Sequence, residues 1–164
     1  MEKQINTRED YVDALITDFT HPQFQAAFRQ YFGELGIQVK DWDALFREMD
    51  RGDAGEKNAA YVRTEEDGSV IGFILFTPIR FTSWFFEETC GFIREFWVAE
   101  EFRGQGHGSA LLTLAEGRFL EVGIHTAILT TSTATPFYGR HGYARAAGCG
   151  AKNQDEVLIK RLTR

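Results

Sequence analysis

The chain has 164 residues and a formal net charge of −6, with 43% hydrophobic, 26% charged and 14% aromatic residues. These proportions are typical of one globular domain over residues 1–164, so they exclude a disordered chain, and the acidic balance argues against a nucleic-acid-binding surface. Cys90 and Cys149 form no CxxC motif, so we expect neither a disulfide framework nor a metal site. The first residues lack the apolar stretch of a signal peptide, and the longest apolar run, 70–76, is too short to span a bilayer. We therefore expect a cytoplasmic protein without a membrane partner.

The first half of the chain is predicted to be mainly helical. A short strand is expected at 3–7, followed by a helix over 8–19. The apolar residues of that helix recur at helical spacing: Tyr11, Ala14, Leu15 and Phe19. Amphipathic helices are predicted over 21–32 and 41–49, and the polar run 50–57, which contains two glycines, is predicted to be a loop.

The second half changes to a strand pattern. Strands are predicted over 59–64 and 69–78, joined by a hairpin turn, and a third strand over 91–98 precedes a helix over 106–122. The remaining elements are predicted as a strand over 125–130, a short helix over 133–141, and strands over 143–147 and 156–162. Helices first, then a meander, then a β-turn-α-β-α-β unit indicate a mixed α/β domain.

A glycine-rich turn joins the strand that ends at Val98 to the following helix. Gly104, Gly106 and Gly108 remove side chains where the backbone must approach another group closely. The first amides of a helix are unpaired donors at the positive end of its dipole, and Arg103 adds a cation, so a pyrophosphate would suit this turn. The alternative is a turn that serves tight packing alone. The G-x-G-x-G order excludes the dinucleotide fingerprint G-x-G-x-x-G, and the chain contains no P-loop.

Two segments carry a resemblance to a known family. Residues 98–112 resemble motif A of the GNAT N-acetyltransferase superfamily, whose core [RQ]-x-x-G-x-[GA] is here Arg103-Gly104-Gln105-Gly106-His107-Gly108. Residues 134–143, with the sequence ATPFYGRHGY, resemble its motif B, A-x-x-[FL]-Y-x-x-x-G-[FY]. The resemblance covers roughly residues 69–162. It implies the acyltransferase fold of that family: a central, mostly antiparallel twisted sheet that is splayed between strands 4 and 5 and flanked by helices.

The resemblance also implies acetyl-CoA, or another acyl-CoA, as the donor. The amides from Arg103 to Ser109 would hold the pyrophosphate, the backbone of Val98 would pair with the pantetheine arm, and His107 would contribute its backbone more than its ring. Thr131 occupies a position where the family often has an asparagine. The residues expected to bind the cofactor are Trp97, Val98, Arg103, Gly104, Gln105, Gly106, His107, Gly108, Ser109, Thr131, Ala134 and Phe137.

Two residues are candidates for the proton transfers of acyl transfer to an amine. Tyr138 stands where the family commonly has its general acid, although it could also only pack against the cofactor. Glu95 lies three residues before Val98 and is the candidate base; the alternative is a solvated or salt-bridged carboxylate next to Arg94. Strand alternation places Arg94 and Glu95 on opposite faces unless a bulge intervenes, so only one of them is expected to face the acceptor.

The acceptor site is expected near an aromatic cluster that includes Trp84 and Phe85, with Arg94 close by. This segment either covers the acceptor as a loop or forms core beneath one. The leading hypothesis is an acetyl-CoA-dependent N-acetyltransferase that acts on a primary amine of a small molecule or peptide, by direct attack in a ternary complex. Two alternatives are a non-catalytic acyl-CoA-binding module of the same fold and a purely structural domain. A homodimer is a further expectation, since dimers are common for the fold.

Overall fold

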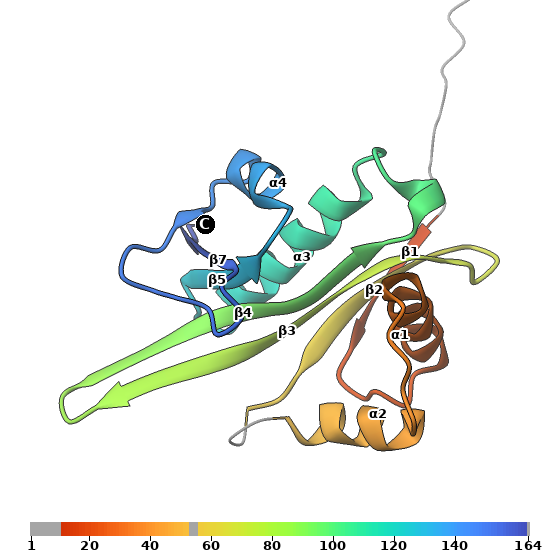
Figure 1. The fold of residues 1–164 in the computed structure, drawn as a ribbon, viewed down its shortest axis with the longest axis horizontal. Coiled ribbons are helices and arrows are strands. Elements are labelled where there is room, and N and C mark those ends of the chain that lie inside the picture. The colour runs from red at the N-terminus through yellow and green to blue at the C-terminus, as the bar shows by residue number, and fades with distance from the viewer. Residues whose placement is uncertain (1–10, 53–55, 164) are drawn as a thin grey trace, which may run out of the picture.

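The computed structural model describes residues 11–52 and 56–163, which form a seven-stranded sheet covered by helices on both faces (Figure 1). The strand order is β1-β2-β3-β4-β5-β7-β6. The elements in chain order are β1 (Tyr11–Ile16), α1 (Pro22–Leu35), α2 (Trp42–Arg51), β2 (Ala59–Glu65), β3 (Val70–Ser83), β4 (Phe86–Val98), a 3₁₀ turn (Glu100–Phe102), α3 (His107–Glu121), β5 (Thr126–Thr131), α4 (Thr135–Arg140), β6 (Ala144–Arg145) and β7 (Glu156–Arg161). None of the helices in the described ranges is both long enough and apolar enough to cross a membrane.

The mixed α/β class is confirmed, but the first predicted helix is wrong. The strand predicted at 3–7 lies outside the described residues. Where a helix over 8–19 was expected, residues 11–16 form the edge strand β1, antiparallel to β2. The apolar spacing fits a helix, yet the open edge of β2 offers hydrogen bonds that a helix would leave unmade, and tertiary context overrides weak local preference. The Asp13 carboxylate of β1 also reaches Arg63 of β2, at 2.7 and 2.8 Å.

Two apolar cores lie on opposite faces of the sheet. On one face, Phe73 and Leu75 of β3 pack with α1 and α2, through residues such as Phe28. On the other face, Ile74 and Phe76 pack with α3. Because both faces of β3 are covered, the strand reads in sequence as a nearly continuous apolar run.

The sheet opens between β4 and β5, as the family resemblance implied. These two strands are parallel and pair only over Gly91–Ile93 and Ala127–Leu129. The stretch of β4 from Arg94 to Val98 continues without a β5 neighbour. This divergence gives β4 an open edge, which borders the start of α3 and α4 (Figure 1).

The strands β3 and β4, predicted over 69–78 and 91–98, extend toward each other and form a long hairpin. The pairing of β3 with β2 ends at Phe76, whereas its pairing with β4 continues to Ser83 and Phe86. Residues 77–83 and 86–90 therefore run beyond both neighbouring strands as a two-stranded ribbon, which we call the arm, and the two residues between them form its tip. Figure 1 shows the arm leaving the body of the molecule in green.

Candidate active site

The glycine-rich turn leads into the N-terminus of α3. Gly106 is the N-cap residue, with φ of 87°, and Gly104 has φ of 75°; both values are costly for residues with a side chain. No side chain caps this helix start. The amides of the first turn, such as those of Gly108 and Ser109, have no partners within the helix and carry the positive end of its dipole, so the turn can bind an anion.

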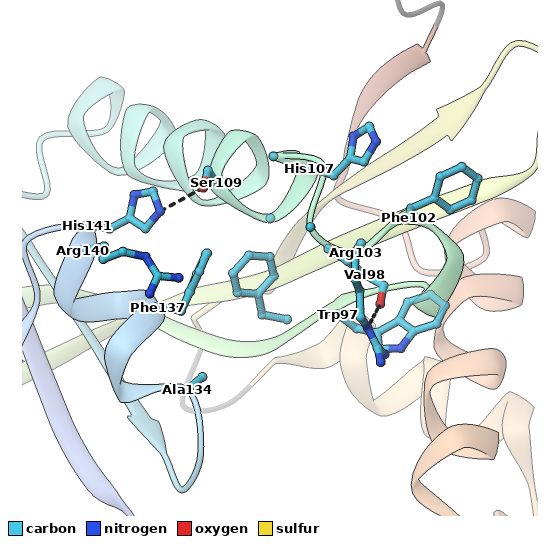
Figure 2. A pocket seen from close by; sticks show the side chains of 14 residues that line it. Trp97, Val98, Phe102, Arg103, His107, Ser109, Ala134, Phe137, Arg140 and His141 are labelled. Carbon is cyan, nitrogen blue, oxygen red and sulfur yellow. Dashed lines mark hydrogen bonds between the residues drawn. The ribbon is translucent and has the colours of Figure 1, made fainter.

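A cavity of about 500 Å³ lies between the end of β4, this turn and α4 (Figure 2). Its volume is in the range of cofactor sites. The lining residues are Phe96, Trp97, Val98, Phe102, Arg103, Gly104, Gly106, His107, Gly108, Ser109, Ala134, Phe137, Arg140 and His141. Most residues predicted to bind the cofactor are among them. We call this space the donor cavity.

Gln105 and Thr131 are predicted cofactor residues that do not line the donor cavity. The Gln105 side chain donates a hydrogen bond to the backbone oxygen of Glu101 at 3.0 Å. The Thr131 hydroxyl accepts one from the amide of Ala134, also at 3.0 Å. Both side chains thus stabilise local turns, and their contact with a cofactor stays a prediction.

Two arginines reach the donor cavity from opposite sides. Arg103 donates to the backbone oxygen of Val98 at 2.9 Å and pairs with Glu34 of α1, which also accepts a hydrogen bond from the indole of Trp97 at 2.8 Å. These bonds, with Arg103 first, hold the pKa of Glu34 below its ordinary value. Arg140, at the end of α4, forms no hydrogen bond or ion pair with any residue in the described ranges. The sequence analysis missed it; its signal was a basic residue two positions after Tyr138.

The ring of His107 belongs to the scaffold of the turn. It is buried and points away from the donor cavity (Figure 2), with Nδ1 3.2 Å from Nη1 of Arg63. Tyr11 and Phe102 contact it edge-on. The turn is therefore anchored to β2 and, through the Asp13–Arg63 pair, to β1. On its other side, the Ser109 hydroxyl lies 2.9 Å from Nε2 of His141, which links α3 to α4.

Tyr138 lies behind the donor cavity, with 7% of its surface exposed. Its ring packs against Phe96 and Phe137, and its hydroxyl has no hydrogen-bond partner among residues 11–52 and 56–163. Burial raises the pKa of Tyr138 to about 12, so the phenol stays protonated at neutral pH and is available as a donor.

A β-bulge in β4 decides where Arg94 and Glu95 point. Leu75 pairs with Glu95 and the next residue of β3, Phe76, pairs with Ile93, so Arg94 is the extra residue. Only one of the two was expected to face the acceptor side unless a bulge intervened, and here a bulge intervenes. Both line a second cavity, of about 210 Å³, on the face covered by α1 and α2. Its other lining residues are Phe28, Phe32, Leu45, Glu48, Met49, Gly52, Asn58 and Leu75.

Within this second cavity, which we call the acceptor cavity, Glu95 is held by Tyr31 of α1. The Tyr31 hydroxyl donates to Oε2 of Glu95 at 2.5 Å. Burial raises the pKa of Glu95, while the bond from Tyr31 and the charge of Arg94 act in the opposite direction. Burial, with the bond to Glu95, also raises the pKa of Tyr31. The sequence analysis missed Tyr31 because nothing local to α1 shows that it meets β4.

Trp84 and Phe85 do not lie at this site. They form the tip of the arm and are 93% and 100% exposed, so the alternative that they belong to the core is wrong. Neither lines the acceptor cavity. The two strands were predicted only over 69–78 and 91–98; because β3 and β4 stay paired as far as Ser83 and Phe86, the turn lies well outside the sheet.

Comparisons with known proteins agree with this architecture. The sequence profile of the acetyltransferase (GNAT) family matches residues 13–143. Among solved structures, a protein assigned as a GNAT-family acetyltransferase from Desulfovibrio desulfuricans is 21% identical, with a TM-score of 0.67 over 93% of this chain and 98% of that one. One assigned as an N-acetyltransferase from Lactobacillus plantarum is 18% identical, with a TM-score of 0.66 over 94% and 99%. N-acetylglutamate synthase from Neisseria gonorrhoeae, solved with coenzyme A and N-acetylglutamate, is 16% identical, with a TM-score of 0.61 over 93% of this chain and 36% of that one.

Proposed function

Because the chain belongs to the GNAT acetyltransferase family, we propose that it transfers the acetyl group of acetyl-CoA to a primary amine of a small molecule or peptide. The amine attacks directly while both substrates are bound. The observation that carries this proposal is the position of the two cavities on β4. Phe96 lines the donor cavity, and its neighbour Glu95 lines the acceptor cavity on the other face. Both residues belong to the stretch of β4 that has no β5 partner.

The donor cavity fits an acyl-CoA, which supplies an activated thioester. The amides at the start of α3 would hold the pyrophosphate, with Arg103 and Arg140 as countercharges. Two features of the turn support this fit. No side chain caps the helix start, and a Cβ on Gly104 or Gly106 would meet no described atom within 4 Å, so the backbone is open to a ligand.

The acceptor cavity supplies a base for the amine. An alkylammonium of pKa about 10.4 must lose a proton before attack, at a cost of about 4–5 kcal/mol near neutral pH. We assign this proton to Glu95, whose raised pKa makes it a better base than an exposed carboxylate. Apolar side chains such as Phe28 and Met49 would pack the body of the amine.

Tyr138 would serve the leaving group. An alkyl thiol has a pKa of about 8.5, well below that of a buried tyrosine, so full transfer of the phenol proton to the thiolate is uphill. We therefore assign Tyr138 a hydrogen bond to the departing sulfur. Two observations support this role: its ring packs against Phe96, which lines the donor cavity, and its hydroxyl has no hydrogen-bond partner among the described residues.

Calorimetric titration with acetyl-CoA, with ATP as the control, tests the donor half. Saturable binding of acetyl-CoA and little binding of ATP are expected; no binding would overturn the proposal. A thiol-release assay with a panel of primary amines tests the acceptor half. In that assay Glu95→Gln should lower the rate about 10²- to 10⁴-fold. Tight acetyl-CoA binding without turnover on any amine would instead favour the non-catalytic module. The cytoplasmic location stays a prediction.

A further inference from the structure

The arm exposes an apolar surface that no other part of residues 11–52 and 56–163 covers. Phe81, Trp84, Phe85 and Phe86 are 48%, 93%, 100% and 58% exposed. Their exposed fractions add up to the surface of about three aromatic residues, which is roughly 450–750 Å² per copy. The largest apolar patch on an ordinary monomer is about 300–600 Å², so this one reaches or exceeds the size that marks an interaction site.

The charges around the arm are already paired within the chain. Arg80 lies 3.3 Å from the carboxylate of Glu56 and 3.4 Å from that of Glu87, and Glu88 lies 4.0 Å from Arg161. A highly charged partner would therefore have to compete with the ion pairs that Arg80, Glu87 and Glu88 already form. The net charge of −6 also opposes contact with an anionic bilayer. These observations favour a neutral, apolar partner surface.

We propose that this surface is covered by the same surface of a second copy, tip against tip about a twofold axis. Identical apolar tips are self-complementary and need no matching charges. Complete burial of this surface on two copies would remove at most about 900–1,500 Å² in all, whereas specific interfaces begin near 1,000–1,200 Å². The dimer is accordingly at the small end of the range and dissociates on dilution. Both active sites lie away from this contact, so each copy keeps its own.

Analytical ultracentrifugation over a wide range of protein concentrations tests the dimer. The wild-type mass should approach twice that of the monomer, and a Trp84→Ser, Phe85→Ser double variant should stay monomeric. Both side chains are almost fully exposed, so the fold should survive, as circular dichroism would show. The matched control is Leu35→Ser with Val122→Ser, which removes exposed apolar side chains outside the arm and should leave the dimer intact. A wild type that stays monomeric, or a double variant that dimerises equally well, would overturn the proposal.

A cross-link tests the twofold geometry. In a Cys149→Ser background, which removes the exposed native thiol, Ser83→Cys places one thiol beside the tip. Mild oxidation should link two copies through this position, because Ser83 adjoins the tip and the proposed twofold axis passes through the tip contact. Val122→Cys in the same background is the control and should link far less. Equal linkage at both positions would overturn the proposal, as would monomeric wild type that floats with phosphatidylserine vesicles.

Discussion

The hydroxyl of Tyr31 donates to the Glu95 carboxylate at 2.5 Å, and this bond opposes the rise in the Glu95 pKa that burial causes. Tyr31→Phe removes the bond and keeps the ring that packs against Phe73 and Trp97. The pKa of Glu95 should therefore rise. Because the base works only when ionised, the acid limb of the pH profile of kcat/KM for the amine should move to higher pH. Steady-state kinetics over a pH series measures the shift.

The control for this prediction is Tyr61→Phe, which removes a phenol of β2 that packs on Phe76. The ionisation of the amine itself contributes equally to every profile, so a difference between variants reports on the enzyme. An acid limb that stays in place in Tyr31→Phe would remove Tyr31 as the residue that positions and tunes Glu95.

A substitution of Tyr138 should affect the rate of acetyl transfer but not the binding of acetyl-CoA. If its hydroxyl contacts the departing sulfur, Tyr138→Phe should lower kcat by about 10²-fold, near the lower limit for groups that act on protons. The affinity for acetyl-CoA should change no more than a few-fold, because the ring still packs against Phe137. Tyr143→Phe, which removes another buried phenol bonded to Glu116, is the matched variant and should not show the same loss of kcat. An unchanged rate in Tyr138→Phe would leave that residue a packing role alone.

At the scale of the helix α3, Gly108 offers a cleaner test of the donor cavity than Gly106. Gly106 has a positive φ, so any substitution there strains the backbone as well. A Cβ on Gly108 would lie 3.6 Å from Phe137 and 3.7 Å from Phe96, which are ordinary contacts within the donor cavity. Gly108→Val should therefore fold and yet abolish measurable acetyl-CoA binding in calorimetry, because its methyl groups fill the space that the ligand needs.

Gly117→Val is the control, since it makes the same change in the same helix where a Cβ would meet nothing within 4 Å. It should bind acetyl-CoA like the wild type, because valine has a higher helix propensity than glycine and the helix should persist. Normal affinity in Gly108→Val would remove this turn from the binding site.

The elements that could be predicted from the sequence are those whose local pattern is compatible with a single secondary structure. The run Gly104, Gly106 and Gly108 after a buried strand requires a tight turn into a helix, and the structure has it. The β1 strand was missed because its apolar residues fit helical spacing, while the deciding factor was the edge of β2. The bulge at Arg94 depends on the register between β3 and β4, which period-two alternation within one strand does not encode. The length of the arm was missed because it also depends on how β3 pairs with β4. The two residues of its turn, Trp84 and Phe85, are neither polar nor glycine, so they do not predict the end of a strand.

Across the whole molecule, the two halves of the chain contribute different parts of the site. The N-terminal half supplies the wall of the acceptor cavity through α1 and α2, and the C-terminal half supplies the donor cavity through α3 and α4. One buried connection ties them together. Asp13 of β1 holds Arg63 of β2, whose guanidinium contacts His107 at the first residue of α3. Stability and donor binding should therefore respond together when this connection is cut.

Asp13→Ala tests that coupling. The Arg63 side chain is only 7% exposed, so loss of its partner leaves a buried charge without compensation, and the free energy of unfolding should fall by about 3 kcal/mol. The affinity for acetyl-CoA should fall as well, because Arg63 then no longer holds His107 and the turn in place. Urea denaturation and calorimetry measure the two effects. Glu121→Ala breaks the exposed Arg118–Glu121 pair instead and should change stability by no more than about 0.5 kcal/mol. A loss of stability in Asp13→Ala with unaltered acetyl-CoA affinity would show that the ion pair supports the sheet alone.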